Sequence, residues 1–196
     1  MIDLHRAAQA AARFYAELET ALRGIQVSDR AGQVLGALDG LSHAIDLILT
    51  QTGHGGTVFF IGNGASAAIA SHQAADFLKA GRMRALAFND AALLTALGND
   101  LGYARVFEWP VAVLADVGDL LIAISSSGRS ENILRGVEAA RARGCAVLTL
   151  SGFEADNPLR SLGDLNLYVP ARSYGHVEIV HLSLLHALLD VIVGLR

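Results

Sequence analysis

The sequence predicts an α/β protein in which helices cover both faces of a five-stranded parallel sheet. Two observations support this class. Apolar runs such as TVFFIG (57–62), DLLIAIS (119–125) and CAVLTLS (145–151) are continuous rather than alternating with polar residues. Segments with the spacing of amphipathic helices separate these runs. Strands that are buried on both faces and alternate with helices are typical of a three-layer α-β-α sandwich.

The expected elements follow one another without a repeat or a low-complexity linker. Residues 3–23 and 29–52 have the apolar spacing of helices, and a Gly-rich turn follows. From residue 57 on, strands and helices alternate, with strands at 57–62, 83–88, 119–125, 145–151 and 165–170, and helices at 65–81, 91–97, 101–113, 130–144 and 176–194. We therefore expect one domain over 1–196, with N-terminal helices over 1–52 and an α/β core over 53–196.

The composition limits the classes of function. Of the 196 residues, 53% are hydrophobic and 17% are charged, and the net charge is −4. This charge gives no electrostatic footprint for nucleic acid or an anionic membrane surface. The most apolar internal stretch, residues 111–125, contains Asp116 and Asp119 and is too interrupted to span a membrane. With no N-terminal signal pattern, we expect a cytoplasmic protein whose apolar surface is buried between subunits.

Two loops of small residues follow the first and third predicted strands. GNGAS (62–66) and SSSGRS (125–130) each open the N-terminus of a predicted helix. Because free backbone N–H groups and the positive end of the helix dipole meet there, such positions bind anions. For a single loop, ordinary turn formation with Ser130 as N-cap is the alternative. Two loops at the carboxyl edge of one parallel sheet favour a phosphate site.

A dinucleotide site is a rival explanation for the first loop. Gly62, Gly64 and Ala67 fit the G-x-G-x-x-A fingerprint. The fingerprint requires an acidic residue about 20 positions further along the chain. Asp90 lies 28 positions past Gly62, and the serine-rich second loop has no role in such a site. The spacing therefore argues against an NAD-dependent enzyme.

Polar side chains on two of the predicted helices suggest proton transfer or metal binding. In the apolar helix VEIVHLSLLHALLD, Glu178, His181 and His186 are costly to bury without partners. His72 and Asp76 stand one turn apart on an earlier helix, so they share a face and can bind one ion. His181 lies about 140° from His186 around its helix and is expected to be a bystander.

Several of these segments occur in the order found in one known family. The segments are GNGAS, SHQAADFL, TALGNDLGY, DLLIAISSSGRSENI and the C-terminal histidine helix. Together they resemble the sugar isomerase (SIS) domain family, and within it the sedoheptulose 7-phosphate isomerases, or phosphoheptose isomerases. The resemblance covers nearly the whole chain. It implies a homotetramer with active sites at subunit interfaces, in which residues 1–52 serve oligomerisation and 53–196 bind a sugar phosphate.

The resemblance also implies roles for individual residues. It assigns substrate binding to Asn63, Ser66, Asn99, Asp100, Ser125, Ser126, Ser127, Ser130 and Glu178. It assigns one zinc ion to His72, Asp76, Glu178 and His186. Asp76 and His186 are then the base and the acid, in an order that the sequence leaves open.

The implied reaction explains why these residue types are needed together. Ketose–aldose isomerisation moves a proton between C1 and C2 through an enediol, which requires a base and an acid. A divalent metal can polarise the carbonyl group. The expected substrate is sedoheptulose 7-phosphate, and the expected product is a heptose 7-phosphate for the activated heptose of surface lipopolysaccharide.

Two positions depart from the family pattern. Asp76 stands where the family has Glu, and Glu178 stands where it has Gln. The segment LKAGRMRAL (78–86) is also shorter than in heptose isomerases. These departures leave an alternative open, in which the chain is a non-catalytic SIS-domain protein that binds phosphosugars or acts as a scaffold, as the replication-initiator-associating relatives do.

Overall fold

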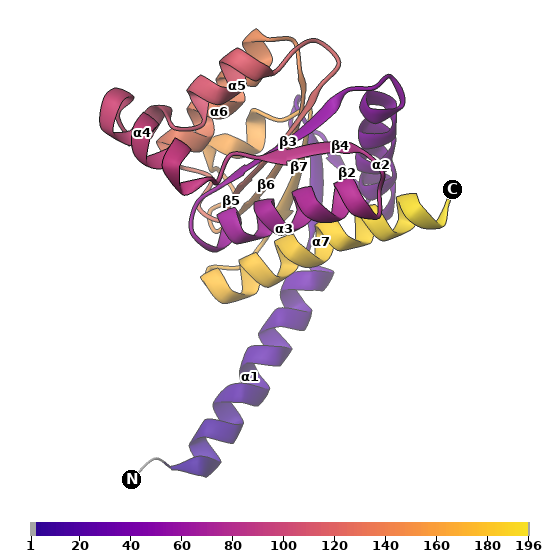
Figure 1. The fold of residues 1–196 in the computed structure, drawn as a ribbon. Helices are drawn as coiled ribbons and strands as arrows, with labels where there is room; N and C mark the ends of the chain where they lie inside the picture. The colour runs from indigo at the N-terminus through magenta and orange to yellow at the C-terminus, as the bar shows by residue number, and fades with distance from the viewer. Residues whose placement is uncertain (1–2, 196) are drawn as a thin grey trace.

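The computed structural model describes residues 3–195, which form a three-layer α/β sandwich (Figure 1). The central sheet has seven strands in the order β2-β1-β7-β6-β5-β3-β4. Five neighbouring strands run parallel: β3 (Thr57–Gly62), β4 (Arg84–Ala87), β5 (Leu120–Ser125), β6 (Ala146–Gly152) and β7 (Leu165–Val169). The five-stranded parallel sheet expected from the sequence is therefore confirmed, with two further strands added to it.

The two added strands form a hairpin at one edge of the sheet. β1 (Gln26–Asp29) pairs antiparallel with β7, and β2 (Val34–Leu35) pairs antiparallel with β1. The turn between them uses Gly32 at φ +82°, a conformation that costs a glycine little. The expectation of a helix from residue 29 is wrong for this segment, because the helix begins at Ala37. Part of 1–52 thus belongs to the sheet, and a role of these residues in oligomerisation stays a prediction.

Helices cover both faces of the sheet (Figure 1). One face carries α2 (Ala37–Gly53), α3 (Ala65–Lys79) and α7 (Tyr174–Gly194), and the other carries α4 (Ala91–Leu101), α5 (Glu108–Leu114) and α6 (Glu131–Ala142). Alternate strand residues enter the two cores. Phe60 and Ile122 belong to the core under α3 and α7, whereas Phe59 and Leu121 belong to the core under α5 and α6. This two-sided burial explains the continuous apolar runs of the strands.

The chain between β4 and β5 differs from the expected pair of short helices. α4 continues to Leu101, and Gly102 at φ +83° ends it. A 3-10 turn, η1 (Tyr103–Arg105), and the short helix α5 then replace the single helix expected over 101–113. The break turns the chain sharply, and it brings Tyr103 back towards the carboxyl ends of the central strands. A second 3-10 turn, η2 (Pro158–Ser161), precedes β7.

Most residues of the helix α1 (Leu4–Arg23) are exposed. The helix extends away from the sandwich, and its last turns lie against α7 (Figure 1). Ala21 is the buried residue of this helix, whereas Leu4, Tyr15 and Leu22 expose apolar side chains. A helix with this much apolar exposure is typical of a surface that contacts another protein.

The terminal helix α7 explains its own apolar sequence. Within residues 3–195 it is the helix long and apolar enough to cross a membrane by length and composition. Its buried residues include Val180, Leu184 and Leu188, which belong to the core on one face of the sheet. The high hydropathy therefore follows from its position as a core helix.

Candidate functional site

A polar cavity of about 120 Å³ lies where β3 and β5 end and where α3 and α6 begin. The two small-residue loops thus lie side by side, as expected from the order of the parallel strands. The helix α7 also contributes two side chains to the lining, which consists of eight polar residues and Ile124. The lining residues are Asn63, Ser66, Ile124, Ser125, Ser126, Ser127, Ser130, Tyr174 and Glu178.

The serine hydroxyls of this cavity are not used to cap helices. Ser130 is the N-cap residue of α6, yet its side chain makes no capping hydrogen bond. Its Oγ instead lies 3.5 Å from the Oγ of Ser125. The Oγ of Ser126 is buried and has no hydrogen-bond partner among the described residues. The Oγ atoms of Ser125 and Ser127 accept turn hydrogen bonds from the N–H groups of Gly128 and Arg129, so turn formation explains part of this loop. Because buried polar groups are normally hydrogen-bonded, the unpartnered hydroxyl of Ser126 favours a ligand with acceptor oxygens in addition.

The serine-rich loop 125–130 is held in place by contacts with residues 157–159. Gly128 lies at φ +61°, and a Cβ atom there would collide with the side chain of Asn157. The backbone N–H of Leu159 donates to the Gly128 carbonyl at 3.1 Å. The loop conformation therefore requires glycine at this position, and it is fixed before any ligand binds.

The two loops are joined by a pair of amide side chains. Asn63 Nδ2 donates to Asn132 Oδ1 at 2.8 Å, and Asn132 Nδ2 donates to Asn63 Oδ1 at 2.9 Å. The hydroxyl of Tyr103 also donates to Asn63 Oδ1, at 3.0 Å. Asn132 and Tyr103 were not expected at the site, although both lie inside the segments DLLIAISSSGRSENI and TALGNDLGY. Their contacts join residues 40 and 69 positions apart, so no local pattern could reveal them.

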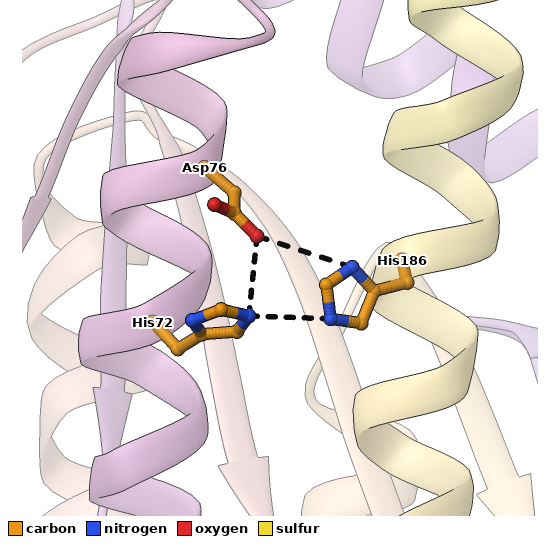
Figure 2. Close-up of side chains that lie close together, drawn as sticks. All are labelled: His72, Asp76 and His186. Atoms are coloured by element: carbon orange, nitrogen blue, oxygen red, sulfur yellow. Dashed lines mark hydrogen bonds and ion pairs between the residues drawn. The ribbon is translucent and has the colours of Figure 1, made fainter.

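Three further side chains meet between α3 and α7 (Figure 2). His72 Nε2 lies 3.2 Å from Asp76 Oδ2 and 3.3 Å from His186 Nε2. His186 Nδ1 lies 3.9 Å from the same Asp76 oxygen. One possible ligand atom from each residue lies within 4.8 Å of the others. The fold therefore brings together three of the four residues that the sequence assigned to a metal.

The geometry of this group fits a divalent transition metal. Two imidazole nitrogens approach as closely as 3.3 Å only when they share a proton or offer their lone pairs to one cation. Nitrogens bound about 2.0–2.1 Å from a tetrahedral Zn²⁺ lie about 3.3 Å apart, which agrees with this distance. Two imidazoles and a carboxylate are also donors that zinc accepts. The side chain of Asp76, one methylene shorter than Glu, still reaches His72.

Glu178 does not join this group in a single chain. It precedes His186 by two helical turns, about 12 Å along the axis of α7, and it lines the serine cavity instead. Burial raises the pKa of its carboxyl group. A carboxylate in an anion cavity opposes the charge of a bound phosphate. The role of Glu178 as a metal ligand stays a prediction.

Two expected substrate-binding residues lie outside the cavity. Asn99 and Asp100 occupy the exposed end of α4, where Asn99 Nδ2 donates to Asp100 Oδ1 at 2.8 Å. Neither residue lines the serine cavity within one chain. Their expected role in binding the sugar therefore has no support from the geometry of one chain and stays a prediction.

His181 is a core residue rather than an interface residue. It is completely buried, and its Nε2 lies 3.1 Å from the carbonyl oxygen of Ser151. Burial lowers the pKa of its imidazole to about 4. The ring is therefore neutral at physiological pH, and it lies apart from the group formed by His72, Asp76 and His186.

Comparisons with known proteins agree with this architecture. Residues 29–152 match the model of the SIS domain family. The phosphoheptose isomerase of Helicobacter hepaticus is 36% identical over 160 residues, covering 78% of this chain and 80% of that protein. The phosphoheptose isomerase of Solidesulfovibrio magneticus is 40% identical over 144 residues, covering 70% of each.

Solved structures extend the similarity to the whole fold. A phosphoheptose isomerase structure from Neisseria gonorrhoeae superposes with a TM-score of 0.83 and 31% identity, over 95% of this chain and 99% of that one. The structure of a phosphoheptose isomerase from Francisella tularensis also gives a TM-score of 0.83, with 28% identity over the full length of both chains. The similarity thus includes the N-terminal part of the chain as well as the core.

Proposed function

The chain belongs to the sugar isomerase (SIS) domain family, and on that premise we propose that it is a phosphoheptose isomerase. It interconverts sedoheptulose 7-phosphate and a heptose 7-phosphate. One observation carries the proposal: His72, Asp76 and His186 converge between α3 and α7, the helices that also line the serine cavity, in a chain that is 36–40% identical to named phosphoheptose isomerases.

In this proposal the serine cavity holds the phosphate of the substrate. The hydroxyls donate to phosphate oxygens, and the N-termini of α3 and α6 direct their positive ends at the same point. Asn63 lies beside the sugar, and Asn99 and Asp100 contact its hydroxyl groups. The proposed phosphate ligands are Ser66, Ser125, Ser126, Ser127 and Ser130.

Asp76 and His186 then move the protons of the reaction. Asp76 removes a proton from C1 of the ketose while His186 protonates the C2 carbonyl oxygen, which gives the enediol. Loss of the O1 proton and protonation at C2 complete the aldose. We propose zinc as the cofactor, with His72, Asp76, His186 and Glu178 as the residues that would hold it, and zinc bound there would polarise the substrate carbonyl.

We further propose that the protein is a homotetramer with sites at subunit interfaces. The projecting helix α1 and its exposed Leu4, Tyr15 and Leu22 support this. A neighbouring chain at the half-exposed His72 also provides the enclosure that an enediol needs. Light scattering coupled to size exclusion tests the assembly. A mass of four chains of 20.6 kDa is expected, and a monomer contradicts it.

The proposed reaction takes place in the cytoplasm and supplies heptose for nucleotide activation and surface lipopolysaccharide. A direct assay tests the reaction itself. The purified protein is incubated with sedoheptulose 7-phosphate, with and without added zinc, and the aldose product is measured. Turnover that depends on zinc is expected. No turnover under either condition contradicts the proposed activity and leaves the non-catalytic phosphosugar-binding alternative.

A further inference from the structure

We propose that Tyr103 is a positioning residue for the ligand in the serine cavity, and that it acts through Asn63. The inference rests on the proposed function, because it concerns how the same cavity recognises its sugar phosphate. Tyr103 lies in η1, on a part of the chain that contributes nothing to the lining of the cavity. Its link to the cavity is the hydrogen bond from its hydroxyl to Asn63 Oδ1.

The hydrogen bonds of Asn63 can be counted completely. Its Oδ1 accepts from Asn132 Nδ2 and from the Tyr103 hydroxyl, which uses both lone pairs of this oxygen. Its Nδ2 carries two N–H groups, and one of them donates to Asn132 Oδ1. One N–H of Asn63 therefore remains for an occupant of the cavity that Asn63 lines.

The amide pair alone does not determine this orientation. When both amide groups of Asn63 and Asn132 rotate by half a turn, the two hydrogen bonds between them form again with oxygen and nitrogen exchanged. In that second arrangement Asn63 presents a carbonyl oxygen to the cavity, which repels a phosphate. Asn132 is 3% exposed, so water has little access to it and cannot select between the arrangements.

Tyr103 removes this ambiguity. A phenol hydroxyl is a stronger hydrogen-bond donor than acceptor, so it favours the arrangement in which Asn63 Oδ1 faces the tyrosine. The free N–H of Asn63 then lies on the side of the amide group away from Tyr103, where it can donate to an occupant of the cavity that Asn63 lines. A donor that is oriented before binding costs the ligand less ordering and contributes more to its affinity.

Tyr103 has little part in the core of the protein, which makes the inference testable. It is 60% exposed, and its ring belongs to neither hydrophobic core. Substitution by phenylalanine removes the hydroxyl and keeps the ring. Ser161→Ala, at an exposed position of η2 outside the cavity, provides a control for loss of a hydroxyl.

The experiment is a double-mutant cycle with Tyr103→Phe, Asn63→Ala and the double variant, in the full-length protein. Three quantities are measured in each: the Kd of inorganic phosphate by calorimetry, and kcat and KM for sedoheptulose 7-phosphate. Tyr103→Phe alone raises the phosphate Kd and the KM about fivefold, the effect of one hydrogen bond, and changes kcat less than twofold. In the Asn63→Ala background, Tyr103→Phe has no further effect, and the control Ser161→Ala has none in either.

Each contrary outcome has its own meaning. If Tyr103→Phe leaves the phosphate Kd and the KM unchanged, the inference is wrong. If it raises them equally in both backgrounds, the hydroxyl contacts the ligand directly and does not act through Asn63, which also overturns the inference. If the wild-type protein shows no turnover, the proposed function fails, and the phosphate titrations still decide the role of Tyr103.

Discussion

The serine cavity and the group formed by His72, Asp76 and His186 differ in how completely one chain builds them. Ser66, Ser125 and Ser126 are 4–5% exposed, and a fixed loop holds two of them. The side chains of His72, Asp76 and His186 are 52%, 24% and 38% exposed, and they lie on the outer faces of two helices. The proposed anion cavity is therefore complete within one chain, whereas the side chains of His72, Asp76 and His186 are open to a neighbour or a ligand.

This difference follows from the elements that carry each region. Loops at the carboxyl edge of a parallel sheet are fixed by the strands behind them, so their small residues converge without long side chains. The group formed by His72, Asp76 and His186 depends instead on side chains that extend from α3 and α7 towards one another. Glu178 lies on the same helix as His186, yet it belongs to the cavity, which makes α7 the element that links the two regions.

The largest expected effect separates the two regions by function. His186→Ala removes a proton-transfer group, and we expect kcat to fall by about 10²–10⁴-fold, the usual contribution of general acid–base catalysis. The Kd of inorganic phosphate, measured by calorimetry, should stay within about twofold because the serine cavity is unchanged. His43→Ala, at an exposed position of α2, serves as the matched control. Loss of phosphate binding in His186→Ala would mean that the regions are not separate.

The burial of His181, which lies in α7 between Glu178 and His186, is tested by the stability of the protein in acid. The unfolded chain protonates His181 below a pH of about 6.5, whereas in the folded protein burial holds its pKa near 4. The free energy of unfolding is therefore unaffected by His181 above pH 6.5. It decreases as the pH falls from 6.5 towards 4, by about 2 kcal/mol at pH 5. Urea unfolding at pH 7.5 and pH 5, at a fixed chain concentration, measures this loss. The non-titrating His181→Gln variant should lose less between these values, and an equal loss in both proteins would contradict the prediction.

A smaller effect tests the unused hydroxyl in the cavity. Ser126→Ala removes a buried donor that has no partner among residues 3–195, so we expect phosphate to bind about tenfold more weakly. The free energy of unfolding without ligand should stay equal or rise, because no internal hydrogen bond is lost. Ser42→Ala, at an exposed serine of α2, is the control. Unchanged phosphate affinity, or a clear loss of stability, would show that Ser126 has a structural role instead.

The smallest effect assigns Glu178 to one of the two regions. Glu178→Gln removes a negative charge from the cavity, and we expect phosphate to bind a few-fold more tightly at neutral pH. Zinc affinity should be little changed if Glu178 belongs to the cavity alone. If zinc affinity instead falls at least tenfold, Glu178 acts as a metal ligand and belongs with His72, Asp76 and His186. Glu138→Gln, at an exposed position of α6, controls for the charge change.

The sequence allowed the serine cavity to be predicted more fully than the rest of the site. Strand ends and small-residue loops are local signals, and parallel strands place their carboxyl ends at one edge, so the loops had to meet. The hairpin of β1 and β2 was missed because its alternation lasts only a few residues and merges into a helical pattern. The contact of Tyr103 with Asn63 depends on how η1 packs against the loops, and no spacing rule along the chain contains that information. The separation of Glu178 from His186, in contrast, follows from their spacing along one helix.

One measurement tests the central claim that Asp76 and His186 perform proton transfer on a sugar phosphate. Sedoheptulose 7-phosphate is incubated with the zinc-loaded protein in deuterated water, and the carbon-bound hydrogens at C1 and C2 are followed by NMR. Deuterium should enter at these carbons with the wild-type protein and not with Asp76→Asn. Equal incorporation by Asp76→Asn, or none by the wild-type protein, would contradict the claim.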